Sequence, residues 1–265
     1  MRDRRSRAAR DSATFNPRSV PEVAAGYLWD PGLVTGLATS GFTLPEMNGH
    51  TAFNGLQSNT ALQPAALSLN GQSLFRMPNT ASAFLAMSAA AAAGWTGATG
   101  VMGWYRLPDA NGDITGTSTL FAHNTSAGNQ RRLIILLSAT ADRLQIQTCT
   151  NSGTSFLITE FANPFVGGAF HWIEAFFDPL FVLGGSLATE RVKLFVDFVQ
   201  QTPVTTVSAG TALFDGIANA TITSTASGKD RLDWGRIHYT NGIASLPHRV
   251  RCANACNPTG TLLAA

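Results

Sequence analysis

Short hydrophobic runs separated by turn residues make up the chain from about residue 50 to about residue 245. In many of these runs hydrophobic and polar positions alternate, which is typical of β-strands with one face in a core. Nine segments are the clearest strand candidates: residues 100–106, 118–123, 132–138, 143–149, 155–160, 171–178, 190–197, 203–207 and 232–239. Strands at near-regular spacing, without helix–strand alternation, predict an antiparallel sandwich or barrel and argue against a parallel α/β sheet.

Two further segments refine this prediction. The turn dipeptide Asn70-Gly71 separates strand-like residues 65–69 from residues 73–77, which predicts a hairpin. Residues 82–93 (SAFLAMSAAAAA) are rich in Ala and end before Gly94, so they predict a short helix or, alternatively, a loop packed on the edge of the sandwich.

The segment 171–178 is hydrophobic at both of its alternating sets of positions. One face would carry Trp172, Glu174, Phe176 and Asp178, and the other Ile173, Ala175 and Phe177. Such a strand is expected at the centre of a sheet or beneath a partner. In the segment 190–197, Phe195 falls on the face opposite the main apolar set, and we predict that it lies on the concave face.

The order of these strands resembles the laminin-G-like branch of the concanavalin A-like jelly rolls. Members of this family often show six sequence patterns in order. The first three are a hairpin with the pattern F-D-G, a strand that ends in Trp and a second aromatic residue, and a strand with T-L-F. The last three are a strand that runs from Trp to F-D, a strand with V-x-L-Y-V-D-G, and a final strand with I-G-x-I. The matching positions are Phe53-Asn54-Gly55, residues 101–105, Thr119-Leu120-Phe121, residues 172–178, residues 192–197 and residues 234–237. The resemblance implies an all-β fold, an antiparallel jelly-roll β-sandwich, over residues 46–246. An extended basic, Pro- and Gly-rich N-terminal arm over residues 1–45 and a short C-terminal tail over residues 247–265 would flank it.

Motifs for catalysis and metal binding are missing from the sequence. Asp109, Asn111 and Asp113 have a calcium-like spacing, but the later ligands of an EF-hand are missing, so a turn is the better interpretation. Glycosidases on this fold use paired carboxylates, whereas Glu174 and Asp178 on one strand would lie roughly 13 Å apart. There is no nucleophile elbow, P-loop or HExxH motif. We predict no enzyme activity, no metal and no cofactor.

The composition adds information on partners and location. Charged residues make up only 13% of the chain, so either uncharged polar residues or a partner must cover much of the surface. No run of 18 apolar residues and no secretion signal is present, which argues against a membrane location. Cys252 and Cys256 could form a local disulfide or stay as two free thiols.

The N-terminal arm carries an uneven share of the charge. Residues 1–18 hold six Arg against two Asp, a local net charge of +4. We predict that the arm binds a partner, since guanidinium groups match both carboxylates and phosphates. The candidate partner-binding residues are Arg2, Arg4, Arg5, Arg7, Arg10 and Trp29. We expect Trp29 to pack on the body or on a neighbouring chain, and contact of the arm with nucleic acid is left open.

Together these features favour a non-enzymatic structural protein in the virion of a tailed bacteriophage. It would decorate or cement the capsid, or join head and tail, by docking on other virion proteins and on copies of itself. Four features favour this interpretation: the low fraction of charged residues, the excess of Arg over Lys, the long arm, and the lack of a recognisable catalytic site. The alternative is a carbohydrate-binding, lectin-like module for host-surface adhesion. Its rings for sugar stacking would be Trp104, Tyr105, Trp234 and Tyr239, although each is more often a core residue.

Overall fold

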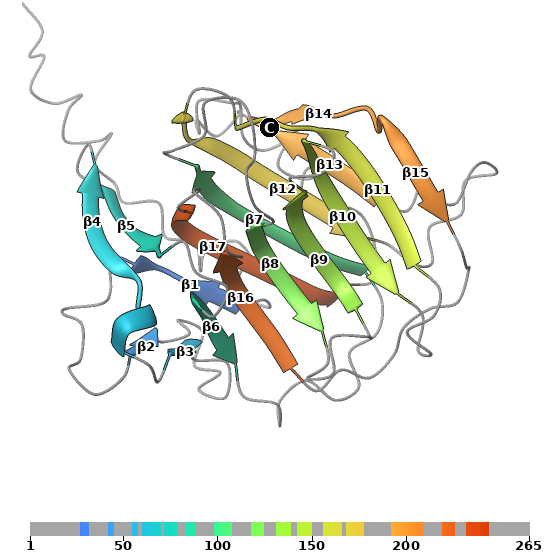
Figure 1. Cartoon of the computed structure of the whole chain (residues 1–265). Coiled ribbons are helices and arrows are strands. Elements are labelled where there is room, and N and C mark those ends of the chain that lie inside the picture. The colour runs from blue at the N-terminus through green and yellow to red at the C-terminus, as the bar shows by residue number, and fades with distance from the viewer. Residues whose placement is uncertain are drawn as a thin grey trace, which may run out of the picture.

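The fold is an antiparallel β-sandwich of two facing sheets (Figure 1), seen in a computed structural model of the chain. The structure describes residues 27–31, 42–44, 55–57, 60–69, 72–78, 83–87, 98–107, 118–124, 131–138, 142–149, 156–165, 168–177, 192–208, 219–225 and 232–243. Their one helical element is a single 3-10 turn, η4 (Thr60–Leu62). The predicted all-β sandwich is therefore confirmed. No helix of the described residues is long and apolar enough to cross a membrane.

Sheet A has eight strands. In spatial order they are β14 (Val199–Gln200), β13 (Val192–Val196), β12 (His171–Phe177), β7 (Ala98–Arg106), β17 (Leu232–Ile243), β5 (Gln72–Met77) and β4 (Ala65–Leu69), with β1 (Tyr27–Trp29) also on β17. β12 lies between β13 and β7, which confirms the central position predicted from its two hydrophobic faces.

Sheet B has nine strands. In spatial order they are β15 (Thr205–Ser208), β11 (Phe156–Ala162), β10 (Arg143–Cys149), β9 (Arg131–Ser138), β8 (Ser118–Asn124), β16 (Asn219–Thr225), β6 (Ala83–Met87), β3 (Gly55–Gln57) and β2 (Phe42–Leu44). Each of the nine predicted segments overlaps a strand of one of the two sheets, and β4 and β5 form the hairpin predicted at Asn70-Gly71.

The predicted helix over residues 82–93 is wrong where the structure describes it. Residues 83–87 form β6, which pairs with β16 on one side and with β3 on the other. Ala is the best helix former, but intrinsic propensity is small beside tertiary interactions, and sheet pairing on both sides overrides it here. The rest of this segment, residues 88–93, lies outside the described residues.

The predicted arm also needs correction. Within residues 1–45, which we placed before the sandwich, β1 is a strand of sheet A and β2 a strand of sheet B. β1 pairs with residues 237–239 of β17, and β2 pairs with β3. Residues 27–44 therefore contribute strands to the sandwich, while residues 1–26 and the predicted tail, 247–265, lie outside the described residues.

The core lies between the inner faces of the two sheets. Its largest fully buried side chains are Trp29, Trp234, Tyr105, Phe75, Phe121, Phe161, Phe165 and Met77. β12 contributes alternate residues to it, as predicted: Ile173, Ala175 and Phe177. On the opposite, outer face of sheet A, a second buried cluster contains Met102, Phe176 and Phe195, with Trp172 packed against it. Phe195 thus lies on the outer face, as its position in the alternation indicated.

Candidate functional site

Two of the four predicted sugar-stacking rings do not reach the surface. Tyr105 and Trp234 are directly opposite each other on β7 and β17, and both side chains are wholly buried in the core. A buried ring has no free face for a sugar, so these two assignments are wrong. Burial also raises the pKa of the Tyr105 phenol well above its usual value, which keeps the group neutral.

The third predicted ring, Trp104, is 40% exposed on the outer face of sheet A. The fourth, Tyr239, belongs to β17 opposite Val101, and the placement of its side chain lies outside the described part of the structure. Trp29 is fully buried in the core of its own chain, so its ring packs on the body and not on a neighbour. The candidate residues Arg2, Arg4, Arg5, Arg7 and Arg10 all lie outside the described residues.

Trp104 is part of a row of three rings, which we call the aromatic row: Trp104, Trp172 and Phe198. Trp104 and Trp172 face each other across the β7–β12 pair, with ring centroids 5.3 Å apart and planes at 60°. Phe198 follows on the far side of Trp172, with centroids 6.2 Å apart and planes at 25°. The row therefore crosses sheet A from β7 to the β13–β14 turn.

A glycine leaves space beside this row. A Cβ atom at Gly235 of β17 would lie 3.4 Å from the Cβ of Trp104 and 3.3 Å from the Cδ2 of Leu74. The contact with Leu74 would be tighter than most packed contacts, whereas the contact with Trp104 would be at the limit of an ordinary van der Waals contact. A side chain at position 235 would therefore press first on Leu74, beside the exposed indole.

The β13–β14 turn places Phe198 in an unusual conformation. Asp197 has a φ of 48° and Phe198 a φ of 69°, between the paired residues Val196 and Val199. Two-residue hairpin turns with two positive φ angles favour Asn-Gly or Asp-Gly, because a side chain in this region is strained. The resembled family motif has Gly after its Asp, and this chain has Phe198 instead. A bulky residue in the left-handed region indicates a local requirement for its ring.

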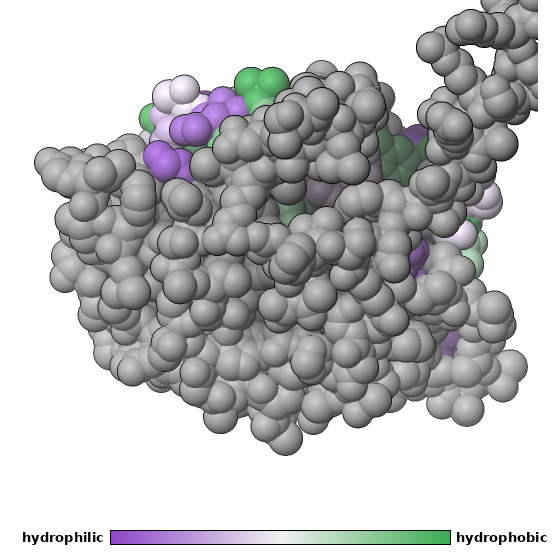
Figure 2. All heavy atoms as spheres, turned by 180° about the vertical axis from the view of Figure 1, so that it is seen from behind, coloured by the Kyte–Doolittle hydropathy of each residue, from purple (hydrophilic) through white to green (hydrophobic). Residues whose placement is uncertain are grey.

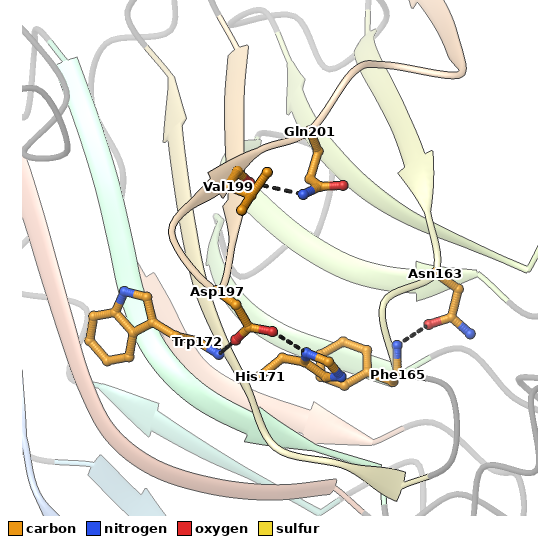
Figure 3. Close-up of polar contacts among 7 residues, drawn as sticks. All are labelled: Asn163, Phe165, His171, Trp172, Asp197, Val199 and Gln201. Carbon is orange, nitrogen blue, oxygen red and sulfur yellow. Dashed lines mark hydrogen bonds and ion pairs between the residues drawn. The ribbon is translucent and has the colours of Figure 1, made fainter. Parts of the chain in front are cut away.

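Asp197 ties this turn to the beginning of β12 (Figure 3). Its carboxylate accepts hydrogen bonds from the backbone N–H of Trp172 at 2.9 Å and contacts Nδ1 of His171 at 2.7 Å. The backbone N–H of Asp197 also donates to the carbonyl of Trp172 at 2.9 Å. These contacts hold the turn, and with it Phe198, beside Trp172.

The side chains of His171 and Trp172 point to opposite sides of β12 (Figure 3). The His171 ring packs edge-on against the buried Phe165 at 5.6 Å. Asn163 holds the backbone of Phe165, because its Oδ1 accepts the Phe165 N–H at 2.9 Å. His171 therefore belongs to the support of the site rather than to the aromatic row.

A buried acid fixes the orientation of the Trp172 indole. Its Nε1–H donates to Oε1 of Glu174 at 2.7 Å, and Glu174 is only 3% exposed. Next to them lies the outer cluster of Met102, Phe176 and Phe195. A ring held by a hydrogen bond and by packing loses little freedom when a ligand stacks on it, so the aromatic row is preorganised.

Strain at Phe198 predicts an order of stability between two variants. Both Phe198→Ala and Phe198→Gly remove the ring, but only Gly adopts the left-handed conformation without strain. We expect Phe198→Gly to be more stable than Phe198→Ala by about 1 kcal/mol. Urea denaturation followed by circular dichroism measures the difference. Equal stabilities would show that the turn relaxes out of the left-handed region when the ring is absent.

Trp172 and Phe198 are functional candidates that the sequence interpretation missed. The alternation in residues 171–177 already separated Trp172 from the core set, which was the available signal. For Phe198, the signal was an aromatic residue at a turn position that normally takes Gly.

No protein-family model matches the chain, and no curated protein sequence matches it. Among solved structures, the binding domain of botulinum neurotoxin DC in complex with rat synaptotagmin II has a TM-score of 0.58 at 9% identity, over 85% of this chain and 50% of that one. The binding domain of Paraclostridial Mosquitocidal Protein 1 has a TM-score of 0.57 at 9% identity, over 88% and 52%. The ligand-binding domain of botulinum neurotoxin serotype D, in complex with N-acetylneuraminic acid, has a TM-score of 0.53 at 7% identity, over 94% and 56%.

This chain thus spans about half the length of these structures. At such low identity the likeness shows a shared β-sandwich fold. The comparison assigns no residue to the candidate site, and the choice of these residues rests on the geometry described above.

Proposed function

We propose that this protein is a carbohydrate-binding module, the alternative interpretation of its sequence. The observation that carries the proposal is the aromatic row, in which neighbouring elements of one sheet place three rings in contact and Trp104 is 40% exposed. Exposed, preorganised rings beside buried polar groups are what a sugar face needs for stacking and hydrogen bonding. The compared structures add support, because one is a ligand-binding domain in complex with N-acetylneuraminic acid.

In the proposed complex, a sugar ring stacks on Trp104, and Trp172 and Phe198 extend the contact toward the β13–β14 turn. The exposed Asp197 lies at the end of the row and offers acceptor lone pairs to sugar hydroxyl groups. We propose binding without turnover, in a role of adhesion to a glycan-bearing host surface. Incubation of labelled glycans with the protein tests this part, since any released monosaccharide would show hydrolysis.

A glycan array with the full chain tests the binding itself, followed by calorimetry on the best glycan. We expect Trp104→Ala to weaken binding by about five- to thirtyfold, because one ring–sugar stacking contact is worth about 1 to 2 kcal/mol. Val199→Ala is the matched control, since Val199 is 63% exposed and lies outside the row. Absence of binding by the unmodified chain, or equal binding by Trp104→Ala, would contradict the proposal.

The virion role stays a prediction. The basic residues that motivated it lie outside the described residues, and nothing in the fold or in the compared structures supports a phage origin, virion partners or an oligomer. A particle that carries the glycan-binding module on its surface would be compatible with both interpretations. Fractionation of assembled particles, probed with an antibody to this chain, tests the virion role independently of sugar binding.

A further inference from the structure

A row of charged residues runs beside the aromatic row on the outer face of sheet A. Arg76 on β5, Asp233 on β17 and Arg106 on β7 are neighbours across paired strands. On β7, Arg106 lies two residues from Trp104, and residues two apart on a strand share a face. The exposed indole and the guanidinium group are therefore adjacent on one surface.

The charge of Asp233 is already matched by one of its two arginine neighbours. Its Oδ1 accepts from Nε of Arg76 at 2.6 Å, and its Oδ2 accepts from Nη2 of the same residue at 2.8 Å. This fork-to-fork geometry uses both carboxylate oxygens. Asp233 is fully buried, so it has no freedom to turn toward Arg106 without breaking that pair.

Arg106 has no ion pair within the described part of the chain. Its guanidinium carbon lies 5.4 Å from the centre of the Phe170 ring, a cation–π contact that orients the group without neutralising it. Its Nε atom is buried and has no hydrogen-bond partner. A buried donor on a charged group is rarely left unpaired in a native protein, which sets Arg106 apart from the fully paired Arg76.

We propose that Arg106 binds the carboxylate of an acidic sugar whose ring stacks on Trp104. A guanidinium group can donate two parallel hydrogen bonds to a planar carboxylate, and the contact with Phe170 orients the guanidinium group of Arg106. This inference rests on the proposed carbohydrate binding and adds the class of sugar to it. It predicts that the protein prefers glycans with a carboxylate to neutral glycans of the same size.

Calorimetry on the full chain with matched probes tests the proposal: lactose, 3′-sialyllactose, the methyl ester of 3′-sialyllactose and 3′-sulfolactose. We expect 3′-sialyllactose to bind about tenfold or more tightly than lactose or the ester, as one charge-assisted hydrogen-bonded pair implies. Binding of the acid should also weaken as NaCl is raised, whereas binding of the neutral probes should not.

Two variants separate charge recognition from a structural role of Arg106. Arg106→Gln should lower the affinity for 3′-sialyllactose to about that for lactose, and Arg106→Lys should keep part of the preference because it retains the charge but not the paired donors of the guanidinium group. A merely structural role would weaken all probes together. Thermal unfolding of both variants reports whether the fold is intact. If Arg106→Gln does not fold, the ratio of the two affinities of Arg106→Lys, for 3′-sialyllactose and for lactose, and the salt dependence still test whether Arg106 recognises the charge.

The possible failures are distinguishable. If no probe and no array glycan binds, the proposed function falls and this inference falls with it. If neutral and acidic probes bind equally, the carbohydrate-binding proposal stands but the role of Arg106 is overturned. Tighter binding of 3′-sulfolactose than of 3′-sialyllactose would overturn the assignment to a carboxylate.

Discussion

Replacement of Trp29 by alanine is expected to lower the free energy of unfolding by about 3 to 5 kcal/mol. Trp29 is fully buried in the main core, and its strand β1 pairs with β17 through the contact of Trp29 with Ile237. Truncation of an indole in a packed core removes buried apolar surface and leaves a cavity that the neighbours fill only in part. Because domains are stable by only about 5 to 15 kcal/mol, the loss would be a large share of the total.

Urea denaturation followed by circular dichroism measures the loss, and Trp104→Ala is the matched control. It is the same chemical change at a residue that is 40% exposed, so we expect a loss of about 1 kcal/mol or less. A Trp29→Ala variant as stable as the Trp104→Ala variant would show that β1 is not part of the core.

The sequence patterns predicted the strands of the body well and the strands of the N-terminal region poorly. Residues 132–138 hold five apolar residues in a row and residues 143–147 alternate polar with apolar positions, and β9 and β10 are found there. β1 has only three residues, which is too short to show a period. Its partner, β17, lies some 200 residues further along the chain, and local patterns carry no information on such long-range pairing.

The candidate site was only partly predictable for a related reason. The strand that holds Trp104 and Tyr105 is hydrophobic at both sets of alternating positions, so its sequence does not show which ring faces the core. Pairing decides this, because Tyr105 is opposite Trp234 and both lie between the sheets. Trp104 is then forced outward, where β12 brings Trp172 beside it.

The described part of the surface is mixed in polarity. In the view from behind, described hydrophobic and hydrophilic residues reach the surface together along the upper edge (Figure 2). Of the exposed large hydrophobic residues that the structure describes, Trp104 is the aromatic one, and Val199 and Val204 are the others. A surface of this mixed kind suits a ligand with both apolar faces and hydroxyl groups, which is the character of a sugar.

Replacement of Arg76 by alanine is also expected to have a large effect, both on the free energy of unfolding and on sugar selectivity. In Arg76→Ala the fully buried carboxylate of Asp233 loses the residue that donates the hydrogen bonds to Oδ1 and Oδ2 described above. A buried charge left without any partner costs about 3 to 5 kcal/mol, and a new pairing with a neighbouring cation would offset part of that cost. Arg76→Ala/Asp233→Ala should recover part of this loss, because no charge then stays buried, and urea denaturation of the three variants measures the coupling.

Arg106 lies on the other side of Asp233 and is the cation that could take over. In Arg76→Ala we therefore expect Arg106 to pair with Asp233 and to be withdrawn from the ligand. The preference for 3′-sialyllactose over lactose should fall, while stacking on Trp104 preserves lactose binding. In Arg76→Ala/Asp233→Ala, Arg106 is free again and the preference should return. A preference that is the same in all three proteins would show that the two arginines do not compete for Asp233. It would also show that the acid group of the sugar is recognised elsewhere.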